Sequence, residues 1–313
     1  MRGPNATPFD PHSPEAQAIS SLFVNTLVIC GVIGVLVAAL VGYCVVKFRA
    51  PPGKTKEPPQ THGSHRLEIA WTLVPFFIVV GIFVLTIQAA GASDPSVPPD
   101  RAPDVVVVGH QWWWEARYPS GVITANEIHI PVGKPLLVRV ESADVIHDFW
   151  VPQLARKIDA VPGHPSTIWM SADAPGTYLG ACAEYCGAQH AWMRIVVEAQ
   201  NQADFDAWQQ HELAGPIPPT TDAATRGRDL FAQKTCIQCH AVAGMPVGAR
   251  VAPDLTHVAE RKTLGAGVIA NDPDGLARWL KHPQRIKPSC HMPDLQLTDA
   301  EVSDFVAWFE TLR

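Results

Sequence analysis

The sequence predicts a multidomain chain with three parts: two long apolar helices, an all-β segment and a helical C-terminal segment. The first observation is a pair of runs without a charged residue, Ala16 to Val46 and Ile69 to Ser93. The second is a series of short β-branched runs between residues 104 and 199, separated by Gly and Pro. The third is a helical spacing of apolar residues from Thr298 to Leu312. At 313 residues, two or three domains are expected.

The two charge-free runs are each longer than the ~20 residues that cross a bilayer as a helix. The mean hydropathy of the whole chain is only +0.05, so its apolar residues are concentrated in these runs. A buried core helix is the alternative, but two such runs near the N-terminus favour membrane spans. We expect a transmembrane helical hairpin over residues 18–93. The Pro-rich, polar residues 1–17 are expected to form a poorly ordered tail.

The segment between the two runs is rich in positive charge. Its basic residues are Lys47, Arg49, Lys54, Lys56 and Arg66, against the single acid Glu57. Positively charged loops stay cytoplasmic. We therefore expect a two-pass protein of the bacterial inner (cell) membrane with both termini on the periplasmic side. The net charge of −6 argues against nucleic-acid binding through a basic surface.

The remainder of the chain divides at Pro-rich stretches. Residues 94–201 form the expected all-β periplasmic domain, in which Val105–Val108 is a β-branched run and Leu136–Glu141 alternates. A linker over residues 202–221 combines a short helix, 202–213, with a stiff Pro-rich stretch. Residues 222–313 form the C-terminal domain, and its last helix is expected to start at an N-cap, Thr298.

One run of the β domain carries four soft metal ligands within twelve residues: Cys182, Cys186, His190 and Met193. Thiolate, imidazole and thioether together select copper over magnesium or calcium. A structural zinc site more often shows Cys-x2-Cys and does not recruit a methionine. A disulfide between the two cysteines is the alternative in an external domain. It leaves His190 and Met193 unexplained.

The C-terminal domain contains Cys236-Ile-Gln-Cys239-His240, the signature of covalent c-type haem. Both thiols would form thioethers to the haem, and His240 would be the proximal iron ligand. A chance match or a redox dithiol could give the same letters. The later His291-Met292-Pro-Asp-Leu and the amphipathic C-terminal segment argue against both. Copper and haem in one chain predict electron transfer.

These motifs carry a resemblance to a known family. The copper run resembles the binuclear copper (CuA) loop of cytochrome c oxidase subunit II, and residues 222–313 resemble small monohaem cytochrome c domains. From about residue 20 to 313 the chain resembles subunit II of a haem–copper oxidase with a fused cytochrome c, the caa type. The resemblance implies a two-helix transmembrane hairpin, an all-β cupredoxin-like (Greek-key) domain and an all-α class I cytochrome c domain.

The resemblance also implies a ligand set for the copper pair, with Cys182 and Cys186 bridging the two ions. The implied copper ligands are His147, Cys182, Glu184 through its backbone carbonyl, Cys186, His190 and Met193. In the family the carboxylate of Glu184 also helps to bind a magnesium or manganese ion that faces subunit I, for which a hard oxygen ligand is suitable. A solvated loop acid is the alternative for this side chain.

The sixth ligand of the haem iron is expected to be Met292, which lies 52 residues after His240 and matches the cytochrome pattern. Met/His ligation raises the reduction potential. Met245 follows His240 too closely to reach the opposite haem face. The histidines 257, 282 and 291 are competitors, and His291 is the runner-up.

Two further residues receive roles from the resemblance. Trp112, the first aromatic in Gly-His-Gln-Trp-Trp-Trp-Glu, matches the exposed residue through which electrons enter the copper pair. Because side chains alternate along a strand, Trp113 should point away from Trp112 and Trp114. Packing is the expected role of Trp113 and Trp114. Glu68, at the start of the second span, matches a glutamate at the entrance of a proton path. An acid at a helix start is also simply favourable.

The predicted function is that of an electron-transfer subunit. Electrons would pass from haem c to CuA and on to haem a of subunit I, in a cytochrome c oxidase that reduces oxygen to water and pumps protons. Expected partners are subunits I and III, membrane lipid, and an upstream cytochrome c or another donor. The alternatives are a CuA-containing subunit of a nitric oxide reductase and a non-enzymatic membrane-tethered copper or electron carrier. Glu68 favours the oxygen reductase, while Trp112 and Glu184 argue for a fixed partner. A quinol-oxidising subunit II lacks such copper ligands.

Overall fold

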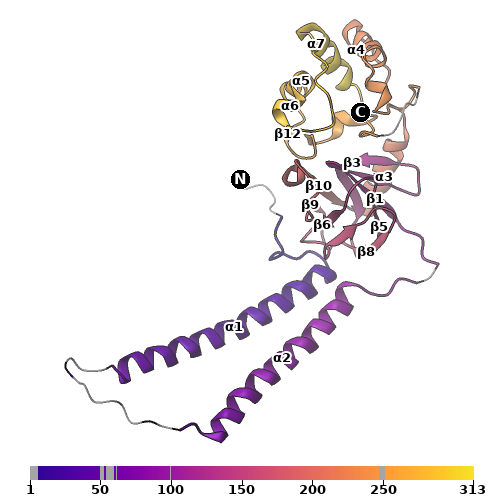
Figure 1. The fold of residues 1–313 in the computed structure, drawn as a ribbon. Coiled ribbons are helices and arrows are strands. Elements are labelled where there is room, and N and C mark those ends of the chain that lie inside the picture. Colours follow the sequence, from indigo (N-terminus) through magenta and orange to yellow (C-terminus); the bar gives the residue numbers. More distant parts are fainter. Residues whose placement is uncertain (1–5, 50–52, 54–59, 61, 99, 247–250) are drawn as a thin grey trace. The chain divides into compact units, whose positions relative to one another are not determined.

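The computed structural model describes residues 6–49, 53, 60, 62–98, 100–246 and 251–313 (Figure 1). Its internal contacts divide the chain into two units, residues 17–95 and residues 1–16 together with 96–313. Of the predicted positive loop, Lys54, Lys56 and Glu57 lie outside the described residues.

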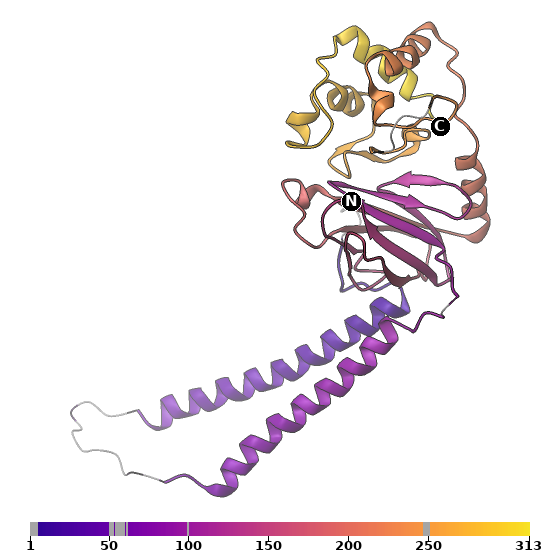
Figure 2. The ribbon, with the colours of Figure 1, turned by 45° about the vertical axis from the view of Figure 1, so that its right-hand side comes forward.

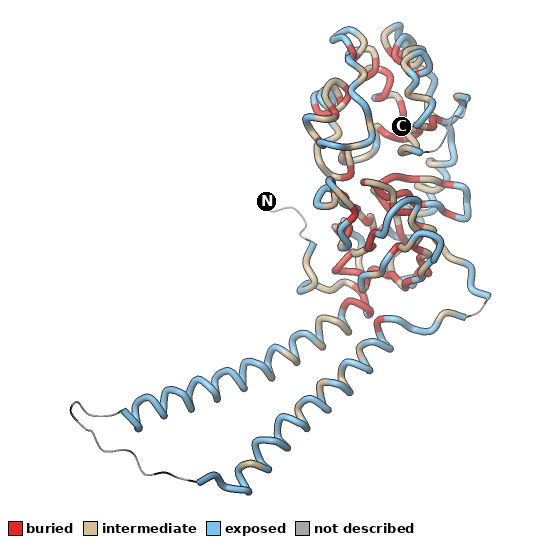
Figure 3. The backbone as a smooth tube through the Cα atoms, viewed as in Figure 1, coloured by how far each residue is buried: buried red, intermediate tan, exposed pale blue. Residues whose placement is uncertain are grey.

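The smaller unit consists of two helices, α1 (Pro14–Lys47) and α2 (His65–Ser93). They coincide with the two charge-free runs, and both are long and apolar enough to cross a membrane. Apolar side chains are exposed along both helices (Figure 3). Exposed apolar surface of this extent marks contact with lipid or other proteins. Pro75 lies inside α2, as neighbouring helices in a membrane allow.

The β domain is a sandwich of two five-stranded sheets, in the orders β3-β2-β1-β5-β8 and β4-β10-β9-β6-β7. The strands are β1 (Val105–His110), β2 (Trp113–Arg117), β3 (Ile123–Ala125), β4 (Glu127–Pro131), β5 (Leu136–Ser142), β6 (His147–Trp150), β7 (Ile158–Ala160), β8 (Ser166–Met170), β9 (Gly176–Cys182) and β10 (Arg194–Gln200). The pairs β1–β5 and β10–β4 are parallel, and the other pairs within the two sheets are antiparallel. These crossovers confirm the expected all-β cupredoxin-like class.

The core of the sandwich fixes the strand ends on which the metal ligands lie. Trp114, Phe149 and Met170 are among its largest fully buried side chains. In the register of β6 against β9, Phe149 pairs with Cys182. The start of β6 and the end of β9 therefore lie at the same edge of one sheet.

The N-terminal tail was expected to be poorly ordered, and for its described part this expectation is wrong. The backbone N–H of His12 donates to the carbonyl of Gln153 (2.8 Å), and the N–H of Asp173 donates to the carbonyl of His12 (2.8 Å). The Ser13 hydroxyl donates to the carbonyl of Leu154 (2.6 Å). These bonds order the segment against the β domain, because each pairs a backbone group that would otherwise be left to water.

The predicted linker also starts with an ordered element. Helix α3 (Gln202–Leu213) packs Phe205 and Trp208 against the core of the β domain. The Trp208 ring stacks on His129 with a centroid distance of 4.1 Å. The first part of this linker therefore extends the β domain, and the chain leaves that domain only after Leu213.

The C-terminal domain is helical, as predicted (Figure 2). Its elements are α4 (Asp222–Gln233), η2 (Cys236–Gln238), η3 (Val258–Glu260), β11 (Thr263–Leu264), β12 (Ile269–Ala270), α5 (Pro273–Lys281), α6 (Pro283–Ile286) and α7 (Asp299–Phe309). Helices α4 and α7 pack closely at Gly227, where a Cβ atom would lie 2.1 Å from the carbonyl oxygen of Asp304. Thr298 and Glu301 form a capping box at the start of α7, which confirms the predicted N-cap.

Candidate metal centres

The two cysteines of the copper run lie side by side at the edge of the β sandwich. The sulfur atoms of Cys182 and Cys186 are 3.8 Å apart, and both thiols are free. A disulfide needs about 2.03–2.05 Å. The structure therefore contradicts the disulfide alternative. His147, at the start of β6, places its Nδ1 atom 3.9 Å from the Cys182 sulfur.

The loop from Cys182 to Met193 brings the other donors to the same place. The Cys186 sulfur lies 3.7 Å from His190 Nδ1 and 3.8 Å from the Met193 sulfur. The carbonyl oxygen of Glu184 is 3.2 Å from the Cys182 sulfur. Gly187, at φ +114°, and the short helix η1 (His190–Trp192) turn the loop back into β10. All six predicted copper ligands thus gather around the two sulfur atoms.

This donor set suits a binuclear copper centre. Metal–thiolate bonds are about 2.3 Å long. At the observed separation, both sulfurs could therefore bind the same copper pair. His147, Cys182, Cys186 and Met193 are buried, which keeps water from the donors. The Nε2 atom of His147 lies 2.8 Å from Asp144 Oδ1, a bond that fixes the ring with Nδ1 facing the sulfurs. Sequence reasoning missed Asp144, whose signal was its position three residues before the histidine.

The electrostatics of the site favour one anionic sulfur of the pair. The hydrogen bond between the two thiols is the main cause that lowers the pKa of Cys182, to about 3, and it raises the pKa of Cys186. Burial opposes the charged form of His147, but the hydrogen bonds and charges of Asp144 and Cys182 together outweigh it and raise the pKa of this histidine. Metal binding requires the thiolate form, so the site is prepared for a cation.

The haem-attachment residues follow directly after α4. Cys236 is half-buried in η2, and Cys239 is exposed. The Nδ1 atom of His240 lies 2.7 Å from the carbonyl oxygen of Pro253, which leaves Nε2 as the ligand atom. Burial lowers the pKa of His240 and so favours the neutral imidazole that binds iron.

The surroundings of these residues suit an apolar macrocycle. Partly buried apolar side chains pack against the domain core beside Cys236: Ile237, Met245, Leu255, Met292 and Leu295. Among the competing ligands, His257 turns its Nε2 atom toward the carbonyls of Glu212 (3.2 Å) and Ala214 (3.1 Å). The ring of His291 lies against Trp112, with a centroid distance of 5.2 Å. Both contacts draw these histidines away from the core against which Met292 packs.

Comparison with known proteins gives matches along most of the chain. Family models match for the cytochrome c oxidase subunit II transmembrane domain (residues 8–88), its periplasmic domain (120–200) and cytochrome c (224–313). Cytochrome c oxidase subunit 2 of Alkalihalophilus pseudofirmus is 34% identical over 316 residues, covering 99% of this chain and 91% of the relative. The chain belongs to the cytochrome c oxidase subunit II family.

Other similar proteins cover less of the chain. A quinol oxidase subunit 2 of Bacillus cereus is 32% identical over 220 residues, which cover 68% of this chain and 75% of that protein. Among solved structures, the periplasmic domain of cytochrome oxidase subunit II of Bradyrhizobium japonicum is 31% identical and covers 37% of this chain and 96% of its own length, with a TM-score of 0.35. The fused cytochrome c domain lies within the region matched by the Alkalihalophilus subunit.

Membership of this family defines the coarse function. The chain is a membrane-anchored electron-transfer subunit of a haem–copper terminal oxidase, and its matched domains imply a CuA copper centre and haem c. Such a subunit works with the oxidase subunit I. The nitric oxide reductase and the free carrier are not favoured by these matches.

Trp112, the expected site of electron entry, contacts the copper loop but is not exposed. Its Nε1 atom donates to the carbonyl of Cys186 (3.0 Å), so the ring contacts the copper loop directly. Only 8% of its surface is exposed: Trp112 belongs to the core of the β domain, and His291 of the cytochrome domain packs against it. The expectation of an exposed Trp112 is therefore wrong for the full chain. Trp113 packs with Ala125 and Ala266 in a separate cluster, which confirms the alternation of faces.

The two glutamates with family-derived roles are both exposed. Glu184 faces solvent while its carbonyl turns toward the copper ligands. Glu68 lies in the first turn of α2, where a carboxylate oxygen is 3.1 Å from His65 Nδ1. These placements leave both carboxylates open to further contacts.

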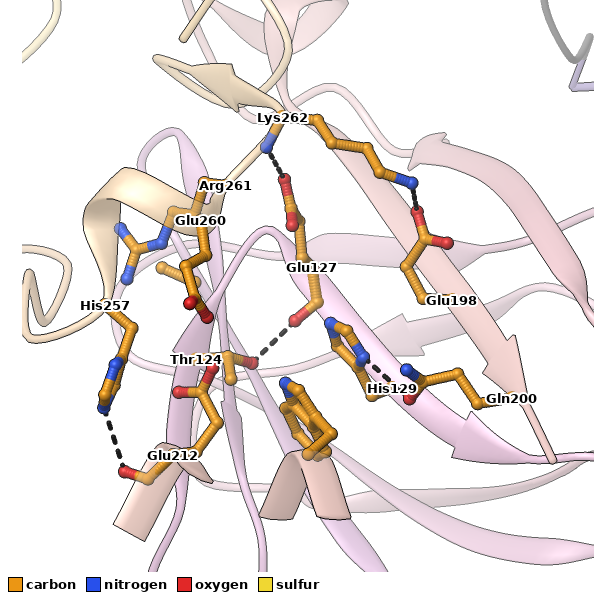
Figure 4. Close-up of a pocket in the computed structure, with 12 residues that line it drawn as sticks. Thr124, Glu127, His129, Glu198, Gln200, Glu212, His257, Glu260, Arg261 and Lys262 are labelled. Atoms are coloured by element: carbon orange, nitrogen blue, oxygen red, sulfur yellow. Dashed lines mark hydrogen bonds and ion pairs between the residues drawn. The ribbon is translucent and has the colours of Figure 1, made fainter. Parts of the chain in front are cut away.

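A separate polar cavity of about 270 Å³ lies between the β domain, α3 and the cytochrome domain (Figure 4). Two of its carboxylates bind Lys262: the backbone N–H of Lys262 donates to Glu127 (2.8 Å), and the Lys262 ammonium pairs with Glu198 (2.5 Å). Burial raises the pKa of Glu127. The cavity shares no lining residue with the predicted copper or haem ligands, and we interpret it as the joint between the two domains.

Proposed function

We propose that electrons enter this subunit at haem c and leave it at the copper pair toward haem a of subunit I. Cys236 and Cys239 attach the haem, and His240 and Met292 bind its iron. The copper ions are held by His147, Cys182, the Glu184 carbonyl, Cys186, His190 and Met193. The observation that carries this proposal is the gathering of these six donors around two sulfur atoms 3.8 Å apart. We divide the chain accordingly into a tail (1–17), a hairpin (18–93), a copper domain (94–201), a linker (202–221) whose helix α3 packs on the copper domain, and a cytochrome domain (222–313).

When bound, the two metal centres supply one-electron carriers, and the protein residues hold and tune them. Asp144 orients His147 through the 2.8 Å bond, which limits movement of the ligand during electron transfer. Met193 is a weak ligand that adjusts the potential. Trp112 contacts the copper loop through Cys186 and is the residue through which electrons reach the copper pair.

The remaining assignments concern the rest of the complex. We infer that the Glu184 carboxylate contributes to a magnesium or manganese site facing subunit I, since it is exposed beside the copper loop. Glu68 serves as the entrance of a proton path at the cytoplasmic end of α2. The basic residues near the hairpin loop support an orientation with both termini on the periplasmic side of the bacterial inner membrane. Subunit III and an upstream cytochrome c complete the set of partners.

A truncation tests the proposed route. Ending the chain after Leu213 keeps α3 on the copper domain and removes the cytochrome domain. We expect the truncated oxidase to keep its copper and subunit I but to depend on added cytochrome c for oxygen uptake. Copper content and haem a spectra control for assembly. If the truncated complex accepts electrons from the physiological donor as fast as the full complex, haem c is not where electrons enter.

A further inference from the structure

Lys287 of the cytochrome domain is buried at the boundary with the copper domain, with only 3% of its surface exposed. Its ammonium donates three hydrogen bonds to backbone carbonyls: Trp112 (2.8 Å), Trp192 (2.9 Å) and Gly265 (2.7 Å). Lysine is almost never fully buried unless it is paired. A lysine ammonium has three N–H donors, and each of them makes one of these three bonds.

The three carbonyls belong to different segments of the molecule. Those of Trp112 and Trp192 belong to the copper domain, one just before β2 and the other in η1 beside the ligand Met193. That of Gly265 belongs to the cytochrome domain, between β11 and β12. Burial lowers the pKa of Lys287 to about 8, so at neutral pH it remains charged and keeps all three donors. Lys287 therefore joins the two domains at one point.

The residues that follow Lys287 lead directly to the haem ligand. The side chain of Gln189, in the copper loop, donates to the carbonyl of Pro288 (2.5 Å). His291, the neighbour of Met292, lies with its ring against Trp112. Trp112 in turn donates to the carbonyl of the copper ligand Cys186. A short series of contacts thus connects the haem-ligand loop with the copper loop.

We propose that Lys287 is a positioning residue that holds the loop 287–292 on the copper domain, with His291 against Trp112. This inference rests on the proposed function, since it takes Met292 and Cys186 as ligands of the two centres. The cytochrome domain is then docked in its working position and does not search for it before each transfer. A soluble donor cannot reach Trp112 and must reduce haem c instead.

Lys262 provides a matched control at the same domain boundary. Its ammonium pairs with Glu198 of the copper domain (2.5 Å), but 58% of the side chain is exposed. Exposed ion pairs contribute little to stability. Replacing Lys262 by methionine removes a lysine from the interface without leaving buried carbonyls unpaired. Replacing Lys287 by methionine keeps the length of the side chain and removes three buried donors.

The first test is oxidative footprinting of the full chain in its oxidase complex. Hydroxyl radicals oxidise exposed aromatic rings, and the oxidation of Trp112 is expressed relative to the summed oxidation of the other aromatic residues of this chain. In Lys287→Met this ratio should rise several-fold, while Lys262→Met should match the wild type. An unchanged ratio in Lys287→Met, with copper and haem retained, overturns the proposal.

The second test follows haem c to CuA transfer after flash reduction. In Lys287→Met the transfer should slow by at least about tenfold and become dependent on viscosity, because three carbonyls lose their donor and the docked state is weakened. Haem spectrum and copper signal should stay unchanged. If the Lys287→Met variant does not assemble, the wild type tests the docked position by itself. A haem c to CuA transfer rate that falls with added glycerol contradicts a docked cytochrome domain. Absence of any haem c to CuA transfer in the wild type contradicts the proposed function. The footprinting result tests the positioning role of Lys287 separately.

Discussion

The copper ligands differ in how firmly each one holds the ions. Cys182 is a buried thiolate placed between His147 and Cys186, and Cys182→Ser replaces a shared soft ligand by a poor one. We expect this variant to lose copper or to keep a single ion. Met193→Leu should keep two coppers and shift the potential. Metal analysis of both purified chains is the measurement, and two coppers in the serine variant contradict the proposed bridging role.

The proposed sixth haem ligand can be removed without touching haem attachment. Met292→Ala leaves Cys236, Cys239 and His240 in place, so the haem should remain covalently bound. The iron loses a strong ligand, so its potential should fall and small ligands should gain access. Carbon monoxide should bind the reduced variant and not the wild type. An unchanged spectrum and potential would instead point to His291.

At this scale, local spacing in the sequence predicted Cys182, Cys186, His190 and Met193 as ligands, and the structure gathers them. His147 and the Glu184 carbonyl came from the family resemblance, and they lie at the same place. The spacing of a loop ligand set is a local property, so it is readable from the chain. Asp144 was missed although its partner His147 lies only three residues further on. Lys287 was not predicted, because its partners depend on how distant segments pack. The buried state of Trp112 was missed for the same reason, since a residue 179 positions later covers it.

At the scale of single elements, helix α7 stabilises the cytochrome domain through charged contacts with α4. The pKa of Glu301 is lowered to about 2, first by its hydrogen bond with Lys234 and then by the backbone N–H of Thr298. Arg226 likewise lowers the pKa of Asp304. A carboxylate with a depressed pKa contributes stability that is present above its unfolded value of 4.5 and is lost as the pH falls toward 2.

Acid should therefore weaken this helix pair in a way that a substitution can isolate. We expect Glu301→Gln to lower the melting temperature of the cytochrome domain near pH 6, and this difference from the wild type should shrink as the pH falls from 4.5 toward 2. Unfolding followed by circular dichroism in the haem band measures it. A difference that stays constant across this range contradicts the assigned role of Glu301.

Elements with a strong local signal were predicted well. The N-cap of α7, the extent of α3 and the runs that became β1 and β5 were all readable, because caps and apolar periodicity act within a few residues. The ordered tail was missed. Its hydrogen bonds join His12 and Ser13 to residues about 140 positions away, and composition alone carries no trace of such pairing.

At the scale of the whole molecule, the cytochrome domain is a tethered electron donor. A tether replaces a bimolecular encounter by an effective concentration on the order of mM. The copper domain, residues 104–199, holds ten acidic and six basic side chains, and residues 222–313 hold eleven of each. The net charges are thus 6 − 10 = −4 and 11 − 11 = 0. With one partner neutral, long-range charge steering is weak, and transfer should depend little on ionic strength.

The domain order could be predicted from the sequence, because each cofactor motif belongs to its own stretch of chain. The docking of the domains could not, because it depends on single contacts such as Lys287 with Trp112.

Flash reduction of the intact oxidase, followed at the haem c and CuA absorbance bands together, tests most directly that electrons reach copper through the fused haem. The prediction is that haem c is reduced first and is then reoxidised with the same first-order rate constant with which CuA is reduced. That constant should be independent of protein concentration and nearly independent of salt. Reduction of CuA at a rate proportional to the donor concentration, with haem c lagging behind, would contradict this route.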